Sequence, residues 1–264
     1  MNTEKVSNHI VNWLKDYAKK ANVKGFVIGV SGGIDSAVTS TLCAKTGLPV
    51  LCVEMPIHQE QNQISRAQEH IKNLKKRFTT ISSLQVDLSN TFDTFTHIVP
   101  SSSNSDKVNL SLANTRARLR MTTLYYLAGL HNSLVAGTGN KVEDFGVGFY
   151  TKYGDGGVDI SPIADLMKSE VYELARYLEV SEAIQTAAPT DGLFGDSRTD
   201  EDQIGASYDE LEWAMKMQDL NKKTDAFYGR EKEVYKIYMR LNSINQHKMM
   251  PIPICKIAEP LKQI

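Results

Sequence analysis

The chain of 264 residues has only three cysteines, Cys43, Cys52 and Cys255, and no CxxC pair. So few and widely spaced cysteines exclude a disulfide framework and are typical of a reducing compartment. No apolar run approaches the roughly 18 residues that a membrane span needs, and the N-terminal segment has no apolar signal core. We therefore expect a cytoplasmic protein without a membrane segment.

The chain also lacks an excess of charge of either sign. Its 30 Lys and Arg residues are balanced by 31 Asp and Glu residues, which gives a formal net charge of −1. Because nucleic-acid-binding proteins usually carry a basic excess, we expect no nucleic-acid partner. The length and the 41% of hydrophobic residues suit one globular domain over residues 1–264.

Short apolar runs alternate with helical patterns along the first part of the chain. Strands are predicted over residues 25–30, 49–55, 78–86 and 134–137, and helices over residues 6–17, 36–45, 58–76, 110–130 and 168–178. This alternation predicts an α/β fold with a doubly wound, mostly parallel sheet flanked by helices, which binds ligands at the carboxyl ends of its strands. The C-terminal part is predicted to be helical, with a last helix over residues 230–247, and residues 100–106 are expected to form a mobile loop or linker.

The turn after the first predicted strand runs from Ser31 to Asp35 and reads SGGID. Gly32 and Gly33 can take positive φ and let a ligand approach closely, and the N–H groups that open the next helix suit an anion. Ser31 and Ser36 add hydroxyl donors, while Asp35 suits a magnesium ion that also contacts phosphate oxygens. The alternative is a tight turn in which Asp35 only caps the helix.

This loop matches neither the Walker A pattern nor the dinucleotide-binding GxGxxG pattern, so a kinase or a Rossmann dehydrogenase loses its main support. Residues 29–36, GVSGGIDS, instead resemble the pyrophosphate loop of the ATP pyrophosphatase superfamily. The resemblance implies that ATP activates a carboxyl or carbonyl oxygen, pyrophosphate leaves, and a nucleophile then displaces AMP. The loop alone does not identify the molecule that is activated.

Polar residues follow the fourth predicted strand, where residues 134–144 read LVAGTGNKVED. We expect Thr138 beside the phosphate loop and Glu143 near the same metal, although Glu143 is alternatively a first-turn acid favoured by a helix dipole. The glycine-rich residues 148–162, GFYTKYGDGGVDISP, suggest a loop shaped around a ligand, with an inert surface turn as the alternative. Lys168 opens a helix, where either a nearby phosphate or simple solvation would explain the amine.

Long segments of the second half resemble the ammonia-dependent NAD synthetase family. They read GTGNKVED, GFYTKYGDGG, VDISPIADLMKSEVYELARYL and PTDGLFGDSRTDEDQIGASYDELE, and the resemblance spans about residues 25–248. It implies an adenine nucleotide α-hydrolase-like fold and a magnesium-dependent ligase that adenylates deamido-NAD with ATP and then transfers ammonia to it. It also implies a homodimer with the dinucleotide site at the subunit interface.

The resemblance assigns roles to the residues at matching positions. The residues implied to bind ATP are Gly29, Val30, Ser31, Gly32, Gly33, Ile34, Asp35, Ser36, Thr138, Lys168 and Thr190. Those implied to hold deamido-NAD are Arg118, Lys152, Asp159, His247 and Lys248. Asp35 and Glu143 would bind magnesium. Asp35, Lys168 and Asp159 would be catalytic, with Asp159 as the hypothetical base for ammonium.

Other polar residues are given no role in the reaction. Arg116 and Arg120 share the helix face opposite Arg118, so we expect them to be solvated or interfacial. The histidines at positions 9, 58, 70, 97 and 131 are expected to be structural or exposed. The acidic residues 196–202 would become ordered when substrate binds in this family.

Three interpretations of the reaction remain distinct at this stage. A glutamine-using synthetase would need a second domain with a nucleophilic cysteine, for which residues 1–24 have no room, so free ammonia is predicted unless a separate subunit delivers it. A tRNA-modifying ATP pyrophosphatase would be expected to carry a basic tract. A nucleotide-binding sensor without catalysis would not need both Asp35 and Glu143.

Overall fold

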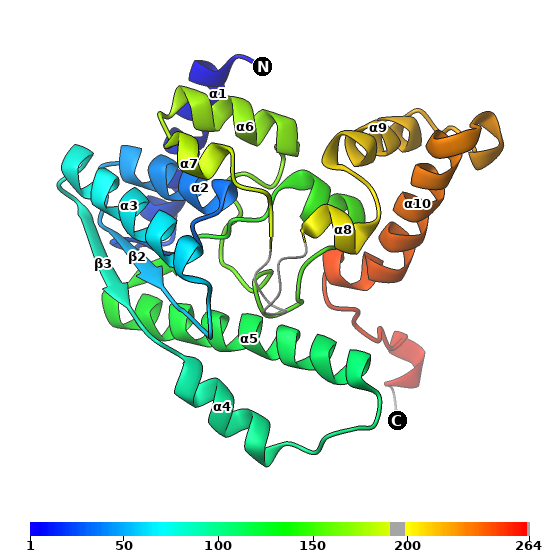
Figure 1. The fold of residues 1–264 in the computed structure, drawn as a ribbon, viewed down its shortest axis with the longest axis horizontal. Helices are drawn as coiled ribbons and strands as arrows, with labels where there is room; N and C mark the ends of the chain where they lie inside the picture. Colours follow the sequence, from blue (N-terminus) through cyan, green and yellow to red (C-terminus); the bar gives the residue numbers. More distant parts are fainter. Residues whose placement is uncertain (191–198, 263–264) are drawn as a thin grey trace.

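The computed structural model describes residues 1–190 and 199–262, and it contains a parallel four-stranded sheet, whose strands β2 and β3 are seen at the left of Figure 1. The strands are β1 (Gly25–Gly29), β2 (Val50–Glu54), β3 (Ile81–Gln85) and β4 (Ser133–Val135), in the order β3-β2-β1-β4. The predicted strands and the doubly wound sheet are confirmed. Because the chain moves outward from β1 to β3 and returns on the other side of β1, the topological switch point lies between β1 and β4. A ligand site is expected at the carboxyl ends of these two strands.

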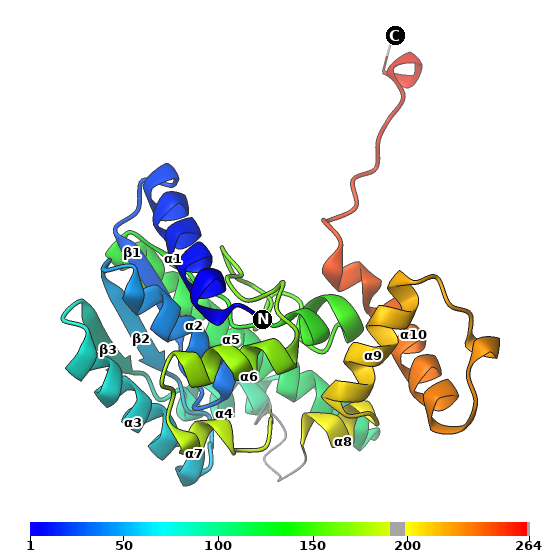
Figure 2. The same cartoon turned by 90° about the horizontal axis from the view of Figure 1, so that it is seen from above.

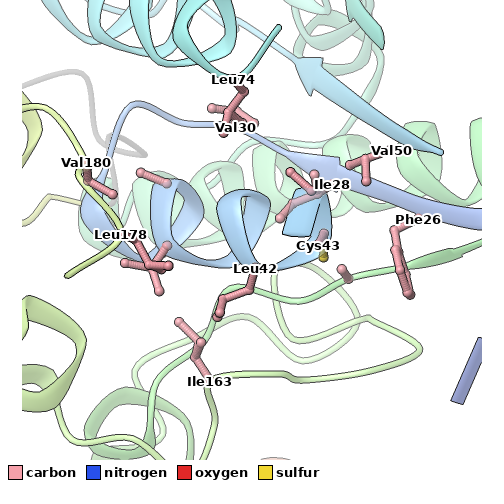
Figure 3. Packing of buried hydrophobic residues seen from close by; sticks show 14 of the residues in the cluster. Phe26, Ile28, Val30, Leu42, Cys43, Val50, Leu74, Ile163, Leu178 and Val180 are labelled. Carbon is pink, nitrogen blue, oxygen red and sulfur yellow. The ribbon is translucent and has the colours of Figure 1, made fainter. Parts of the chain in front are cut away.

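One face of the sheet is covered by α1 (Thr3–Lys20), α2 (Ile34–Lys45), α3 (Gln61–Arg77) and α6 (Lys168–Tyr177). Helix α2 is buried on all sides because it lies between β1, α1, α3 and α6. Figure 3 shows Leu42 and Cys43 of this helix in the largest hydrophobic cluster, together with Ile28 of β1 and with Ile163. Each such fully buried aliphatic side chain contributes roughly 1.5–3 kcal/mol. This packing holds the N-terminus of α2 against the carboxyl end of β1.

The opposite face is covered by α4 (Ser89–Ile98) and α5 (Ser105–His131), whose Phe92 and Leu127 pack on Val27 and Val53 of the sheet. Helix α4 has no counterpart in the sequence prediction. Helix α5 begins at Ser105, earlier than the predicted residue 110. The prediction of a loop over residues 100–106 is therefore wrong for its last two residues, which are helical. The side chain of Asn104 accepts a hydrogen bond from the backbone N–H of Lys107 at 2.9 Å, which caps the added turn.

The C-terminal helices form a second hydrophobic cluster beside the sheet. They are α8 (Asp200–Ile204), α9 (Tyr208–Asp219) and α10 (Gly229–Met249), with a 3-10 turn at Thr224–Ala226. The short helix α7 (Glu182–Gln185) instead packs on the sheet core through Ile184, and a second 3-10 turn, Glu259–Leu261, follows α10. A π-helical segment, Val142–Val147, packs into the same cluster and joins it to the end of β4. After α10 the chain extends away from the body (Figure 2). Residues 196–198 of the acidic stretch lie outside the described part of the chain.

None of the helices within residues 1–190 and 199–262 is long and apolar enough to cross a membrane.

The histidine of α3, His70, is buried against α2. Its ring Nε2 lies 2.8 Å from the Oγ of Ser40, and the residue is 4% exposed. Burial, assisted by the positive charge of Arg77, lowers the pKa of His70 from an ordinary value of 6.5 to about 4. Between these two pKa values the folded protein keeps His70 neutral, whereas the unfolded chain protonates it. The free energy of unfolding is therefore unaffected by this residue above the unfolded pKa, and it declines as the pH falls from there toward 4.

We predict that His70→Gln loses less stability on acidification than the wild-type protein. Between about pH 7.5 and pH 5 the wild type should lose roughly 2 kcal/mol more free energy of unfolding than the variant, because only the wild type has a buried neutral histidine. Urea unfolding at both pH values measures this difference. The exposed His131→Gln variant is the control and should behave as wild type. Equal pH dependence in all three proteins would contradict the prediction.

Candidate active site

The SGGID turn joins the carboxyl end of β1 to the first turn of α2. Gly32 has a φ of 82°, and an added Cβ would lie 2.6 Å from the carbonyl oxygen of Gln63 in α3, so only glycine fits. Gly33 has a φ of −92° and does not need the left-handed region. The Oγ of Ser36 donates to the Gly33 carbonyl at 2.9 Å and accepts from the Ser31 N–H at 3.3 Å. Among the described residues, no side chain caps the N-terminus of α2 at Gly33, which suits a phosphate group.

Two carboxylates converge on one buried ammonium group at the mouth of this turn. Lys168, at the start of α6, is 2% exposed, and its Nζ lies 2.6 Å from the Oδ2 of Asp35 and 3.0 Å from the Oε1 of Glu143. A solvated Lys168 is therefore wrong. The interpretation of Asp35 as a simple helix cap is also wrong, because its carboxylate bonds to Lys168 and Asn140 instead. Glu143 does lie in the first turn of a helical segment, but its side chain points to Lys168.

The electrostatics of the cluster favour a charged lysine. Burial lowers the pKa of Lys168, but Asp35 and Glu143 together raise it above its ordinary value. Burial would raise the pKa of Glu143, whereas Lys168 and the hydroxyl of Tyr208 hold it below its ordinary value. Two carboxylates with a single ammonium group leave an excess of negative charge when both are ionised.

Helix α9 holds two members of this cluster in place. The hydroxyl of Tyr208 donates to the Oε1 of Glu143 at 2.6 Å, and its ring centroid lies 4.7 Å from the Nζ of Lys168. The buried carboxylate of Glu212 accepts hydrogen bonds from the N–H and the Oγ of Ser169, both at 2.8 Å. These contacts fix the first turn of α6, and Lys168 with it.

The donor set fits a magnesium ion that shares its ligands with a substrate. Within residues 1–190 and 199–262, no group of three or more His, Cys, Asp and Glu side chains is arranged to hold a metal ion. Asp35 and Glu143 nevertheless converge on one cationic group and carry excess negative charge. Magnesium is commonly held by one or two carboxylates together with substrate phosphates, and the uncapped turn lies beside these carboxylates.

A cavity at the carboxyl end of the sheet collects most of the residues expected to bind ATP. Those that line it are Gly29, Val30, Ser31, Gly33, Ile34, Asp35, Ser36, Thr138, Lys168 and Thr190. Glu143, expected to bind magnesium, lines it as well. Gly32 is absent from this lining because its Cα faces α3. Residues from β1, from α2, from the segment after β4 and from α6 are thus brought together at the switch point.

Arg120 also lines the cavity, so the expectation that it is solvated or interfacial is wrong. Its Nε donates to the carbonyl of Met55 at 3.1 Å and its Nη2 to the Oε1 of Gln59 at 2.7 Å. Arg116 shares this helix face, as predicted, but its guanidinium stacks 4.1 Å from the ring centroid of Phe92 in α4. The face of α5 that they share turns toward the protein because α4 and the β2 loop pack against it.

Four of the residues expected to hold deamido-NAD gather outside this cavity, around residues 148–157. The Nη2 of Arg118 donates to the carbonyl of Lys152 at 3.3 Å, and the Nζ of Lys152 donates to the carbonyl of His247 at 2.5 Å. The Nζ of Lys248 donates to the carbonyls of Gly148 and Tyr150 at 2.8 and 2.7 Å. The last turn of α10 therefore supports this loop.

Asp159 lies apart from both groups. Its Oδ1 accepts from the hydroxyl of Tyr125 at 3.0 Å, and its Oδ2 accepts from the backbone N–H of Val135 at 2.8 Å. It does not line the cavity, whereas Asp144 and Asp155 do. Burial and the carboxylates of Glu143, Asp155 and Asp35 raise the pKa of Asp144 well above its ordinary value. Sequence reasoning missed Asp144, although the segment that contains it was singled out.

We predict that Lys168→Met strongly destabilises the protein in the absence of divalent cations. Removal of the buried ammonium group leaves two half-buried carboxylates facing each other, which costs about 3–5 kcal/mol of unfolding free energy. Urea unfolding measures this loss, and added magnesium should restore part of it. The control is Lys141→Met, which breaks the exposed 2.9 Å pair with Asp165 and should cost less than about 1 kcal/mol. Similar losses in the two variants would contradict the role of the cluster.

Known proteins resemble the chain over most of its length. The chain is 39% identical over 218 residues to an NH(3)-dependent NAD(+) synthetase of Carboxydothermus hydrogenoformans, covering 80% of this chain and 85% of that protein. It is 36% identical over 249 residues to an NH(3)-dependent NAD(+) synthetase of Mycoplasma genitalium, covering 94% and 93%.

Solved structures show the same fold over nearly the whole chain. An NMN synthetase of Francisella tularensis superimposes with a TM-score of 0.84 at 31% identity, covering 97% of this chain and all of that one. An NH3-dependent NAD synthetase of Campylobacter jejuni, in complex with a nitrate ion, gives a TM-score of 0.77 at 26% identity and the same coverage. The family model for NAD synthase matches residues 6–251. The chain therefore belongs to the NAD synthase family.

Proposed function

We propose that the protein is a magnesium-dependent ligase that uses ATP and ammonia to convert deamido-NAD into NAD. The observation that carries this proposal is the convergence of Asp35, Glu143 and Lys168 beside the uncapped turn at the switch point. The names of the relatives support the choice of substrates. A nucleotide-binding sensor would not need the two carboxylates, and a tRNA-modifying enzyme would be expected to carry a basic excess that this chain lacks.

In the first step a carboxylate oxygen of nicotinate attacks the α-phosphorus of ATP. The bond from that phosphorus to the bridging oxygen breaks and pyrophosphate leaves. The N–H groups that open α2 and the hydroxyls of Ser31 and Ser36 bind phosphate oxygens, and Lys168 adds positive charge beside them. Asp35 and Glu143 would hold magnesium, which would supply positive charge to neutralise the phosphate oxygens. Catalysis in this step consists of alignment and charge neutralisation.

In the second step the nitrogen of ammonia attacks the acyl carbon of the adenylate. The bond from that carbon to the AMP oxygen breaks, AMP leaves, and the nitrogen gives up a proton. Asp159, the base suggested by the sequence, bonds to Tyr125 and to the backbone of β4. Asp155 lines the cavity and is better placed to receive this proton.

We further propose a homodimer in which the dinucleotide site lies between subunits. Helix α5 exposes Tyr126 and Leu130, which are 66% and 63% exposed, and it also exposes Arg118. An apolar surface of this kind suits a protein interface. A dinucleotide held by Arg118 and Lys152, outside the main cavity, would then contact this interface.

A second candidate substrate is nicotinate mononucleotide, which would be amidated to NMN by the same two steps. The observation that favours it is the high structural similarity to the NMN synthetase of Francisella tularensis. The residues around Asp35 would bind ATP in both reactions, so they do not distinguish deamido-NAD from nicotinate mononucleotide. The choice depends on the surface around Arg118 and Lys152, which only the larger dinucleotide would need in full.

The three cysteines are free, which supports a reducing compartment, and we place the enzyme in the cytoplasm.

We predict that pyrophosphate is released over many turnovers only when ATP, magnesium, ammonium and a nicotinate nucleotide are present together, because the adenylate formed without ammonium stays on the enzyme after one release per site. The kcat/KM for deamido-NAD should exceed that for nicotinate mononucleotide, and Asp35→Asn should abolish both activities while the far-UV circular dichroism spectrum stays unchanged. Coupled pyrophosphate detection with each acid in turn measures this. A preference for the mononucleotide would support the second candidate, and no release with either acid would overturn the proposed function.

We predict that Arg118→Ala weakens substrate binding more than it slows chemistry. The KM for deamido-NAD should rise about tenfold, with kcat changed much less, because an ionic contact to a non-reacting part of the substrate contributes to binding. The KM for ATP should stay unchanged. Arg240→Ala, which removes an exposed arginine from α10, is the matched control and should leave both constants as in wild type. An unaltered KM for deamido-NAD would exclude Arg118 from the substrate site.

A further inference from the structure

The two carboxylates of the active site are joined by one buried amide that the reaction itself does not use. Asn140 is fully buried in the turn between β4 and the helical segment Val142–Val147. Its Nδ2 donates to the Oδ1 of Asp35 at 3.1 Å. Its Oδ1 accepts from the backbone N–H groups of Val142 and Glu143, both at 3.1 Å. One side chain thus contacts the first carboxylate and the peptide that carries the second.

The chemistry of these contacts requires an amide. The side facing Asp35 must donate, and the side facing the two N–H groups must accept, which also fixes which end of the amide carries nitrogen. An aspartate would present an oxygen to Asp35 and repel it, and a serine would be too short to reach it. Asparagine is therefore the side chain that satisfies both partners in this turn.

The two carboxylate oxygens of Asp35 have different partners. Asn140 occupies Oδ1, whereas Oδ2 faces Lys168 at 2.6 Å. Asp35 is therefore held so that a single oxygen is presented to a cation. The same amide fixes the first turn of the helical segment, from which Glu143 reaches Lys168.

We propose that Asn140 is a positioning residue that makes the site selective for small divalent cations. Magnesium and manganese favour octahedral coordination with single carboxylate oxygens, whereas calcium accepts more oxygens and bidentate carboxylates. By holding Oδ1, Asn140 keeps Asp35 from offering both oxygens to one ion. This inference rests on the proposed metal site at Asp35 and Glu143.

The test measures manganese binding by electron paramagnetic resonance in the full chain with α,β-methylene-ATP, and calcium competes for the site. Asn140→Ser keeps an oxygen that can cap the Glu143 N–H but no longer reaches Asp35. We expect it to bind manganese about tenfold or more weakly, as for loss of a residue that orients a metal ligand. The ratio of the calcium Kd to the manganese Kd should fall by a similar factor.

Asn140→Asp keeps the shape and the accepting oxygen but repels Asp35, so it should lower the same ratio even if Asn140→Ser fails to fold. The matched control is Asn242→Ser, since Asn242 donates to the carbonyl of Gly146 at 2.7 Å in the same helical segment and touches neither carboxylate. It should keep the wild-type ratio. A wild-type ratio in the Asn140 variants, or an equal loss in the control, would overturn the role of Asn140. If Asp35→Asn binds manganese as wild type does, the metal site itself is wrong.

Discussion

The ion pairs between Lys168 and the carboxylates of Asp35 and Glu143 are the interactions on which the rest of the site depends. An ammonium group that is 2% exposed is stable only with anionic partners, and the carboxylates in turn need the ammonium. The three residues belong to α2, to the segment Val142–Val147 and to α6, so the ion pairs tie these elements together. The same excess of negative charge makes the cluster receptive to a divalent cation.

Two hydrophobic cores hold this cluster from opposite sides. The sheet core buries α2 completely and thereby sets the position of Asp35 at the end of β1. The core of the C-terminal helices contains Val142 and Leu211 and brings Tyr208 and Glu212 of α9 to Glu143 and α6. The active site therefore lies where the two cores meet, and its polar contacts link them.

The cavity and the glycine-rich loop divide the proposed reaction between two regions. The cavity at the switch point collects the residues that we propose for ATP binding, and the loop over residues 148–157, supported by the end of α10, carries Lys152 next to Arg118. In the proposed reaction the first region binds phosphate and the second recognises the acid, and the two meet where Asp155 of the loop lines the cavity. The likeness to both an NAD synthetase and an NMN synthetase is consistent with this division.

Sequence patterns alone predict the strands, the glycine turn after β1 and the family, because buried parallel strands and short glycine turns are local patterns. They also indicate Asp35, Glu143 and Lys168 separately. The packing of the folded chain establishes that Lys168 bridges the two carboxylates, that Arg120 rather than Arg118 lines the cavity, and that Asp159 does not. The contacts of Asn140 with Asp35 and of Tyr208 with Glu143 likewise follow from the packing of distant segments. Contacts between residues more than 60 positions apart depend on how helices pack, and helical spacing alone does not specify which face turns inward.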